Sequence, residues 1–343
     1  MQRRRLDLSY LIRSGLGIPD YWHPYMEIQN DFQSGRIARY PLSMHIKADY
    51  PGQLNDEGVP IVFLDTGPSV SPATVILYGL GSHDAFLNTG YKRYQRQMMR
   101  TLQWLEKHCV PLGHGIGWPN REDLPVYGLK SPWFSGVVQG FALSLLVRGS
   151  QLDSQGPWRG MALQTWRGYH LPIEEGGFNR EMPQGVVYEE YPTSELNFVF
   201  NGMCHALIGL WEARKSGILA DAEEDFDKGV EALRALLPCF TRGSWSLYSL
   251  TQCLGKPLLA SPYYQRTNGL LANVLGRMIG DPEIRTYGDR WLEASGSIVQ
   301  RTLMSLRISI DRFLHAPALL NSDKSKKRPG EPSRYDSSSF ENT

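Results

Sequence analysis

The stretch Asn197-Phe-Val-Phe-Asn-Gly-Met-Cys-His-Ala-Leu-Ile-Gly-Leu-Trp-Glu-Ala-Arg-Lys-Ser216 decides the fold class. Apolar residues occur on nearly every side of a helix drawn through it, which predicts a helix buried among other helices. Near its start a polar residue, Asn201, precedes Gly202 and the apolar run. A polar or aromatic residue precedes a glycine and an apolar run at three further places: Tyr78-Gly79, Gln139-Gly140 and Asn268-Gly269.

The four copies of this pattern are separated by 61, 62 and 67 residues, which indicates a repeated helical hairpin. Each marked helix is followed by an amphipathic one, so the first is expected to be inner and the second outer. Helices are predicted over 72–88, 91–109, 135–148, 157–169, 197–216, 222–237, 267–278 and 282–295. We therefore expect an all-α fold, an α/α barrel of about four hairpins in which the glycines let inner helices approach closely.

The rest of the chain differs in composition. Residues 1–70 are rich in Pro, Gly, Tyr and Asp and lack helical periodicity, so we expect an irregular, extended N-terminal brace. Residues 71–300 are assigned to the barrel and 301–322 to a C-terminal helix. The polar, Ser-rich residues 323–343 cannot repay the entropy of ordering and are expected to form a disordered tail.

Composition bounds the function. The chain has 343 residues, 41% of them hydrophobic, and a net charge of only +1, so no global basic field exists to hold nucleic acid or an anionic membrane. No apolar run approaches the roughly 20 residues of a membrane span, and the N-terminus lacks a secretory signal, so we expect a cytoplasmic protein. Standard nucleotide and metal motifs are lacking, so neither cofactor nor metal is expected.

Three segments rich in tyrosine lie just ahead of inner helices or between helices. They are 187–193, 243–248 and 261–266, and all can reach one end of a barrel. A phenol beside a carboxylate and a cation can act as acid or base in proton transfer at carbon. The spacing alone leaves open the alternative that these Tyr-Pro and Tyr-Tyr pairs only seal the ends of loops.

The residues Tyr188-Glu-Glu-Tyr-Pro-Thr193, Phe198-Val-Phe-Asn-Gly202 and Ala206-Leu-Ile-Gly-Leu210 give this chain a family resemblance. In sequence and spacing the block resembles the C-terminal domain of D-glucuronyl C5-epimerases, including those acting on heparosan-N-sulfate. Shorter matches, such as Glu57-Gly-Val-Pro60 and Gly117-Trp-Pro119, extend the resemblance over about residues 55–295.

The resemblance implies a homodimeric enzyme that inverts C5 of D-glucuronate within an anionic, heparosan-like polysaccharide, giving L-iduronate. The C5 proton lies next to the C6 carboxylate, so its removal produces an enediolate and requires two acid–base groups on opposite faces. The catalytic residues carried over by motif are Glu190, Tyr191, Tyr248 and Tyr264. Those carried over to the sugar groove are Lys130, Gln139, Thr193 and Asn201. Within this set we expect Glu190 and Tyr264 to serve the two faces.

The sequence departs from the family pattern in three places. Thr251 stands where the family usually has an arginine that clamps the substrate, so Arg266 or Arg242 would have to replace it. Asn268 stands where the family usually has a histidine, and an amide does not titrate near neutrality. Animal members also carry a membrane anchor and a β-sandwich ahead of the barrel, for which this sequence leaves no room.

Two other functions remain open from the sequence. A uronate polysaccharide lyase would share the first step, proton abstraction at C5. A non-catalytic glycan-binding protein would use the tyrosines only to stack on sugar rings, but stacking alone has no need of the adjacent carboxylate.

Overall fold

In the computed structural model, residues 13, 15–64, 66–219, 223–251 and 257–320 are described, with side chains as far as Ile310. The inner helices are α2 (Pro72–Thr89), α4 (Gly136–Leu152), α6 (Phe200–Lys215) and α8 (Pro262–Met278). The outer helices are α3 (Lys92–His108), α5 (Trp158–Arg167), α7 (Glu223–Leu236) and α9 (Pro282–Gly296). All eight predicted helices are confirmed. The predicted 323–343 tail lies outside the described residues.

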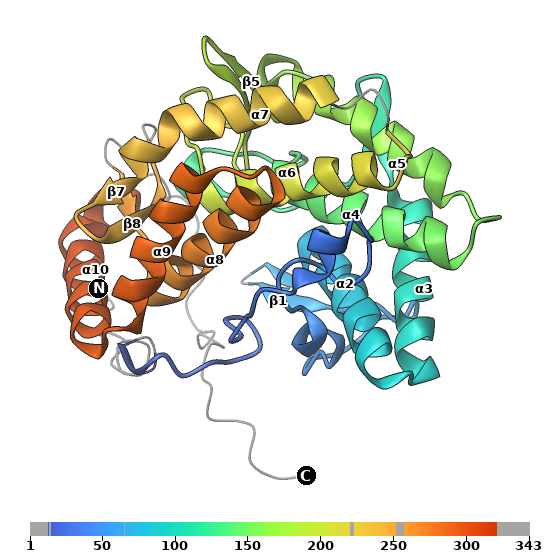
Figure 1. Cartoon of the computed structure of the whole chain (residues 1–343), viewed down its shortest axis with the longest axis horizontal. Coiled ribbons are helices and arrows are strands. Elements are labelled where there is room, and N and C mark those ends of the chain that lie inside the picture. The colour runs from blue at the N-terminus through green and yellow to red at the C-terminus, as the bar shows by residue number, and fades with distance from the viewer. Residues whose placement is uncertain (1–12, 14, 65, 220–222, 252–256, 321–343) are drawn as a thin grey trace.

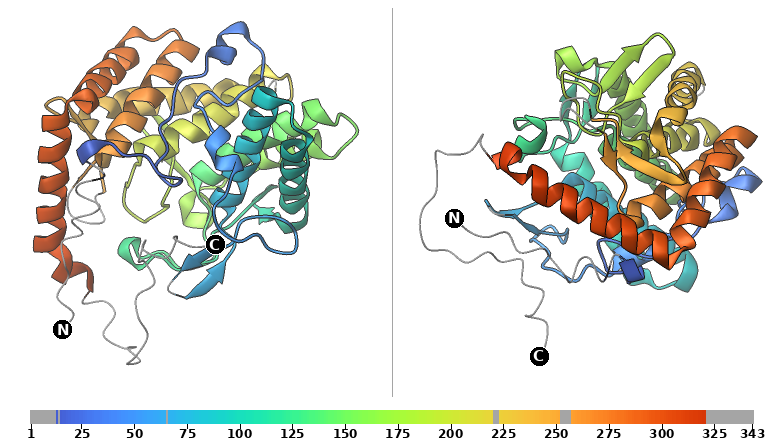
Figure 2. Two further views of the ribbon diagram at one scale, coloured as in Figure 1. Left: turned by 90° about the horizontal axis from the view of Figure 1, so that it is seen from below. Right: turned by 90° about the vertical axis from the view of Figure 1, so that its left-hand side faces the viewer.

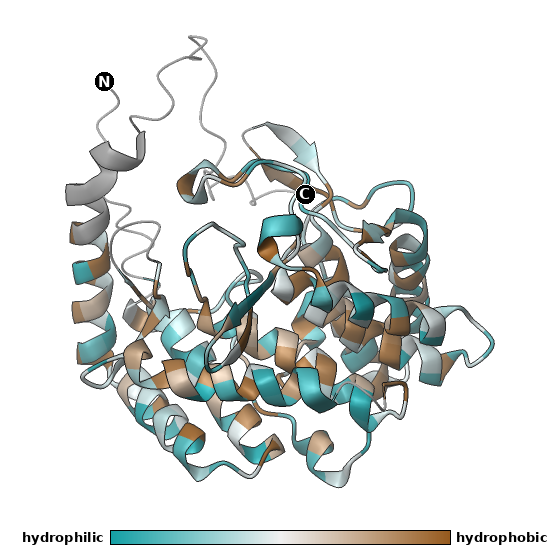
Figure 3. Cartoon of the chain, turned by 90° about the horizontal axis from the view of Figure 1, so that it is seen from above, coloured by the Kyte–Doolittle hydropathy of each residue, from teal (hydrophilic) through white to brown (hydrophobic). Residues whose placement is uncertain are grey.

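The four hairpins follow one another along an arc (Figure 1). The inner helices pack in the order α2, α4, α6, α8, and each outer helix packs on its own inner partner. Every residue of α6 from Phe200 to Ala213 is buried, whereas α7 buries only one face. The hydropathy colouring of Figure 3 shows this mixture of polar and apolar bands along the helices. The expected inner and outer helices are therefore confirmed by burial.

The N-terminal segment lies between the two ends of the arc. The Arg266 side chain, on α8, donates a hydrogen bond to the Met26 carbonyl oxygen. The Asp84 carboxylate, on α2, accepts from the backbone N–H groups of Tyr40 and Met44. One irregular stretch thus contacts both the first and the last inner helix, with short 3₁₀ turns at Asn30–Ser34 and His45–Ala48.

Within the described residues, four small antiparallel sheets depart from the expected all-α fold. They pair β1 (Val62–Leu64) with β2 (Gly67–Ser69), β3 (Val110–Leu112) with β4 (Gly115–Gly117), β5 (Asn179–Met182) with β6 (Gly185–Tyr188), and β7 (Thr241–Arg242) with β8 (Trp245–Ser249), which also pairs with β9 (Leu258–Leu259). Strands of two to five residues are too short to show a two-residue hydrophobic period, so the sequence pattern misses them. Each hairpin precedes an inner helix, so the repeated unit contains a hairpin as well as two helices.

The predicted close approach of inner helices is confirmed at Gly140. A Cβ atom there would lie 2.4 Å from the carbonyl oxygen of His205, on α6. The other marked glycines serve different neighbours: a Cβ at Gly269 would meet the outer helix α9, and one at Gly202 would lie 2.6 Å from the Glu190 carboxylate. The four glycines therefore share a position in the repeat and not a single packing role.

The chain continues after α9 into α10 (Ile298–Leu320), which runs along the side of the helical body (Figure 2). Its packed side meets α8 and α9. Among the helices that the structure describes, none combines the length and the apolar character needed to cross a lipid bilayer.

Candidate active site

Three tyrosines and one glutamate meet where the hairpins enter the inner helices. Glu190 and Tyr191 follow β6, Tyr248 lies on β8, and Tyr264 lies in the first turn of α8. The Tyr191 and Tyr248 hydroxyl oxygens are 3.2 Å apart, and the Tyr248 hydroxyl donates to Glu190 Oε1 at 3.4 Å. The Tyr264 ring meets the Tyr248 ring edge-on, with centroids 4.7 Å apart. The structure brings together all four residues predicted to be catalytic.

The carboxyl group of Glu190 is buried, with 9% of the residue exposed. Burial raises its pKa from 4.5 to about 7, because a desolvated carboxylate loses its hydration, while hydrogen bonds from Tyr191 and Tyr248 oppose the shift. Asn201 Nδ2, on α6, donates to Glu190 Oε2 at 3.4 Å. Gly202 leaves room for this carboxylate against the helix. Glu190 can therefore exchange a proton near neutral pH.

The carboxylate of the neighbouring residue Glu189 is held by an ion pair and by backbone hydrogen bonds. One oxygen, Oε1, accepts from Arg180 Nε and from the Asn197 N–H, both at 3.0 Å, and Oε2 accepts from the Phe198 N–H at 2.9 Å. Arg180 also donates to the carbonyl oxygen of Ser194. Glu189 and Arg180 thus hold the loop that carries Glu190 and Tyr191. Of the two adjacent glutamates, Glu189 anchors this loop and Glu190 is the candidate base.

The phenols of Tyr191 and Tyr248 are neutral hydrogen-bond donors. Burial, more than any other cause, raises the pKa of Tyr191 and of Tyr248 well above 10. A neutral phenol can donate a proton or a hydrogen bond, but it does not act as a base near pH 7. Compared with Tyr191 and Tyr248, Glu190 is the group suited to remove a proton.

Two aromatic residues that the sequence analysis missed flank Tyr191. The Tyr127 ring, at the end of a 3₁₀ turn (Pro125–Tyr127), stacks on the Tyr191 ring with centroids 4.3 Å apart and planes 13° apart. Trp133 lies 6.0 Å from the same ring. Both belong to the aromatic- and proline-containing segment between β4 and α4, which stands in the repeat where the other tyrosine segments stand. This equivalent position in the repeat is the sequence feature that could have identified Tyr127 and Trp133.

The predicted start of the last inner helix was wrong. It was placed at Thr267, with Tyr264 ahead of it, but α8 begins at Pro262. Proline suits the first helical position, and the Ser261 hydroxyl oxygen accepts from the Tyr264 N–H as an N-cap. Tyr264 is consequently held by a helical turn and not by a loop.

The residues predicted to line the sugar groove differ in their hydrogen-bond partners. Asn201 contacts Glu190, as described. Thr193 is buried and its hydroxyl donates to the Glu195 carbonyl oxygen at 2.6 Å. Gln139 is fully buried, and its amide bonds to both the N–H and the carbonyl oxygen of Trp118. Thr193 and Gln139 thus support the surrounding backbone, and their contact with substrate stays a prediction.

The two predicted cationic groups, Lys130 and Arg266, have partners elsewhere in the chain. Lys130 is exposed and its Nζ pairs with Asp123 Oδ2 at 2.7 Å. The Arg266 guanidinium lies 4.0 Å from the centre of the Tyr25 ring and contacts the Met26 carbonyl oxygen. Both side chains contact other residues of the chain, and their contact with substrate stays a prediction. Arg242, the other candidate, is exposed on β7.

Thr251 and Asn268 are fully buried. Thr251 has a φ of +43°, rare for a residue with a branched Cβ, and its N–H donates to the Asn197 carbonyl oxygen. Asn268 donates through Nδ2 to the Ser246 hydroxyl and the Leu247 carbonyl oxygen. Both therefore hold β8 in place beside α6 and α8.

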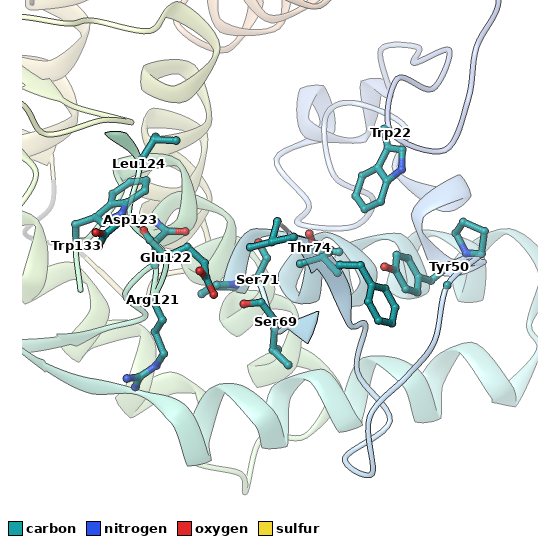
Figure 4. A pocket seen from close by; sticks show the side chains of 18 of the residues that line it. Trp22, Tyr50, Ser69, Ser71, Thr74, Arg121, Glu122, Asp123, Leu124 and Trp133 are labelled. Carbon is teal, nitrogen blue, oxygen red and sulfur yellow. Dashed lines mark hydrogen bonds between the residues drawn. The ribbon is translucent and has the colours of Figure 1, made fainter. Parts of the chain in front are cut away.

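An open cleft of about 750 Å³ lies between the N-terminal segment and the residues around 120–124 (Figure 4). Its walls come from the N-terminal segment, the β1–β2 hairpin, the start of α2 and residues 120–124. Trp133 belongs both to this cleft and to the surroundings of Tyr191. Over the described ranges 15–64, 66–219, 223–251 and 257–310, no group of three or more His, Cys, Asp or Glu side chains could hold a metal ion.

Solved structures support the fold. The chain is similar to D-mannose isomerase with a TM-score of 0.51 and 11% sequence identity, over 78% of this chain and 70% of that one. At this identity the likeness concerns the fold alone, a mostly helical fold of the α/α-barrel type.

Curated relatives match about half of the chain. It is 28% identical over 207 residues to D-glucuronyl C5-epimerase of Caenorhabditis elegans, covering 55% of this chain and 33% of that protein. It is 22% identical over 182 residues to an uncharacterized protein of Methanocaldococcus jannaschii, covering 52% and 58%. This chain thus matches about a third of one relative and somewhat over half of the other.

The family model described as D-glucuronyl C5-epimerase C-terminus matches residues 114–293, which is more than half of the chain. That range contains Glu190, Tyr191, Tyr248 and Tyr264, and ends within α9. The chain therefore belongs to the D-glucuronyl C5-epimerase C-terminal family.

Proposed function

We propose that this protein epimerises D-glucuronate to L-iduronate at C5 within a heparosan-like polysaccharide. The observation that carries the proposal is the buried Glu190 carboxyl, whose pKa is about 7, in contact with the Tyr248 hydroxyl. Family membership supports epimerisation of a uronate. The polymer and the division of roles among the residues are part of the proposal.

In the proposed reaction Glu190 removes the C5 proton. The bonding electrons move into the C6 carboxylate and form an enediolate, and a proton delivered to the opposite face of C5 completes the inversion. Neutral phenols suit the enediolate, since they can donate hydrogen bonds to its oxygens as charge develops. Tyr191 and Tyr248 are assigned this role, and Tyr264 is assigned the opposite face as proton donor.

Hydrogen bonds to Glu190 support its assignment as the base. Asn201 and Tyr248 both donate to its carboxylate, which keeps one group oriented from two elements, α6 and β8. Arg180, on β5, forms an ion pair with Glu189. Stabilisation of the substrate carboxylate is therefore assigned to phenol and amide donors in place of the missing arginine.

Incubation in deuterated water tests the reaction. We expect heparosan to gain deuterium at C5, with L-iduronate formed and no chain cleavage, measured by NMR of the recovered polymer. The Tyr264→Phe variant removes one hydroxyl and should lose the exchange while its thermal unfolding is unchanged. A fully active Tyr264→Phe variant would remove Tyr264 from the mechanism.

The same experiment separates the alternatives. A lyase would shorten the polymer and produce unsaturated ends that absorb ultraviolet light. With a non-catalytic binding protein, addition of the polymer would change the tryptophan fluorescence of the protein, but the polymer would take up no deuterium. Absence of exchange on every glucuronate polymer would overturn the proposed function.

A further inference from the structure

The outer helix α3 concentrates basic side chains on one part of a nearly neutral protein. It contains five lysine and arginine residues and a single acidic residue, Glu106, whereas the whole chain has a net charge of +1. The outer helix α7 differs, since its first turn alone contains three acidic residues. In Figure 1, α3 lies on the outside of the arc, where it packs on α2. The positive charge of α3 is therefore a local feature of the protein surface.

Three of these cations form one row along the helix. Lys92, Arg96 and Arg100 follow one another at intervals of four residues, so they share a face of the helix, with about 6 Å between neighbours along its axis. All three are exposed, and they line an open groove of about 400 Å³ together with two glutamines and Met99. Among the described residues, none with a carboxylate side chain belongs to this lining. We call Lys92, Arg96 and Arg100 the basic row.

The basic row is not neutralised by ion pairs within the protein. The other two cations of α3 do pair with acidic side chains, Arg93 with Asp49 and Lys107 with Glu57. Across the part of the chain that the structure describes, no residue of the basic row forms such a pair, and the Nζ of Lys92 donates to a neutral side-chain amide at 3.1 Å. An anion from solution can therefore bind these three cations without breaking an existing ion pair.

An exposed aromatic ring stands at the start of the same helix. Tyr91 is the N-cap residue of α3, next to Lys92, and it is 61% exposed. An open aromatic ring suits the apolar face of a sugar ring, and nearby cations suit carboxylates carried by that sugar. A helix that binds a membrane exposes an apolar face along its length, whereas the exposed residues of α3 are all polar or charged. The surface therefore fits an anionic polysaccharide better than a lipid bilayer.

This surface precedes the part of the chain that the family model matches. The helix α3 ends at His108, and the match begins at residue 114. The four residues of the candidate active site all lie within the matched range. Charge, exposure and the lack of ion pairs thus identify the surface on α3, and family membership does not.

We propose that the basic row and Tyr91 form a second binding surface for an anionic, uronate-containing polysaccharide, distinct from the Glu190 cluster. The cations hold carboxylates of the polymer, and the tyrosine ring holds the face of one sugar. A long chain held here stays at a high effective concentration for the active site, so the surface favours long chains over short ones. The inference rests on the proposed function for the identity of the polymer.

Binding measured without catalysis is the first test. Isothermal titration with long heparosan chains compares the wild type with the triple variant Lys92→Gln, Arg96→Gln, Arg100→Gln. We expect the triple variant to bind about fivefold more weakly at low ionic strength and to lose most of the salt dependence of binding, because added salt screens exposed charges. Equal affinity of the two proteins at low ionic strength would overturn the inference.

A second triple variant controls for net charge. Arg285→Gln, Arg290→Gln and Arg307→Gln remove three exposed cations from α9 and α10 and change the net charge by the same amount. Binding of heparosan to this control should stay within about twofold of the wild type. An equal loss in both triple variants would show that binding follows net charge, and would overturn the assignment to α3. Should the first triple variant not fold, the single variant Arg96→Glu should bind heparosan more weakly than Arg96→Gln, and the reverse order contradicts the inference.

Two other anions test the class of partner. One is a DNA duplex with as many charges as the heparosan chain, and the other is a phosphatidylcholine vesicle with about 30% phosphatidylserine. At the same ionic strength we expect heparosan to bind more tightly than either. Tighter binding of the DNA or of the vesicle would overturn the assignment to a polysaccharide.

The rate of C5 exchange links this surface to the proposed function. The triple variant of the basic row should raise KM for long heparosan about fivefold with kcat unchanged, and should not change KM for the shortest fragments that still exchange. An equal rise with short fragments would overturn the second surface. If no polymer exchanges but salt-dependent binding to the basic row holds, the proposed function fails and the surface stands. If the triple variant binds and exchanges like the wild type, the surface fails and the proposed function stands.

Discussion

The Tyr248 hydroxyl donates to Glu190 Oε1 at 3.4 Å, joining two residues 58 positions apart in the chain. One comes from a strand and the other from the loop before α6, so their contact exists only in the folded protein. It matters chemically because a hydrogen bond to a carboxylate stabilises the ionised form, whereas the burial of Glu190 opposes ionisation. The pKa of about 7 is the balance of the two effects.

Replacing the candidate base gives the first prediction. Glu190→Gln should reduce deuterium uptake at C5 by about 10²- to 10⁴-fold, the usual contribution of a positioned general base. The rate is measured by NMR on heparosan. Glu231→Gln, with an exposed carboxyl on α7, is the matched control and should keep full activity. A Glu190→Gln variant with more than a tenth of the normal rate would exclude Glu190 as the base.

The pH dependence follows from the same carboxyl. Glu190 must be ionised to accept the C5 proton, so the exchange rate should rise tenfold per pH unit at low pH and level off near pH 7. Tyr248→Phe removes a hydrogen bond that lowers the pKa of Glu190, so the break in its profile should move to higher pH by about half a unit to one unit. A break that stays in place, or moves to lower pH, would contradict the assigned contact.

The free energy of unfolding should fall as pH rises, whereas the exchange rate should increase. The pKa of Glu190 is about 7 in the folded protein and 4.5 as its model value, so the folded state retains a proton that the unfolded chain releases. The resulting stabilisation is complete below about pH 4.5 and is lost as pH rises to about 7. Relative to Glu190→Gln, the wild type should lose about 3 kcal/mol of unfolding free energy across this window. Urea titrations of both proteins at pH 5 and pH 8 measure it.

The buried ion pair beneath the site should dominate the stability of the loop. Arg180→Ala leaves the fully buried Glu189 carboxylate without its cation and should cost about 3 kcal/mol of unfolding free energy. The double variant with Glu189→Gln should be less destabilised than the two single effects combined, because the unpaired charge is gone. Additive effects in this cycle, measured by chemical denaturation, would show that the two residues act independently.

Two glycines of the repeat should respond differently to alanine. Gly202→Ala places a Cβ 2.6 Å from Glu190 Oε2, a side-chain atom that can shift, so activity should fall at least tenfold while the melting temperature changes little. Gly140→Ala meets the backbone of His205 at 2.4 Å, which cannot shift easily, so the main loss should be in stability. The same response in both variants, compared by calorimetry and by C5 exchange, would refute this division.

Much of the helical fold could be read from periodicity. Predicted helix bounds such as 72–88 and 282–295 lie within one residue of α2 and α9, because Pro and Gly mark their ends. The start of α8 was placed five residues late, since the polar first turn at Tyr263 and Tyr264 carries no apolar period. The small sheets were missed because short hairpins depend on turn geometry and on neighbours for their stability.

The family resemblance predicted the four residues of the cluster, but it did not predict which residues surround them. Lys130 and Arg266 are cations with the right chemistry, but their partners, Asp123 and Tyr25, are visible only after folding. Tyr127 was overlooked for the same reason. It lies far from Tyr191 in sequence, and their rings stack because two loops at one end of the helices converge.

By itself the sequence determined the inner and outer helices and their four-fold repetition, since these follow from periodicity and local capping, while its family resemblance predicted the roles of the tyrosines and Glu190. Only the tertiary structure decided that Glu189 is an anchor and Glu190 the group with a pKa of about 7, and that Trp133 of an aromatic cleft lies near Tyr191. The physical reason is that burial, ion pairing and cavity shape arise from contacts between segments distant in sequence, and a carboxyl group acquires its chemistry from those contacts.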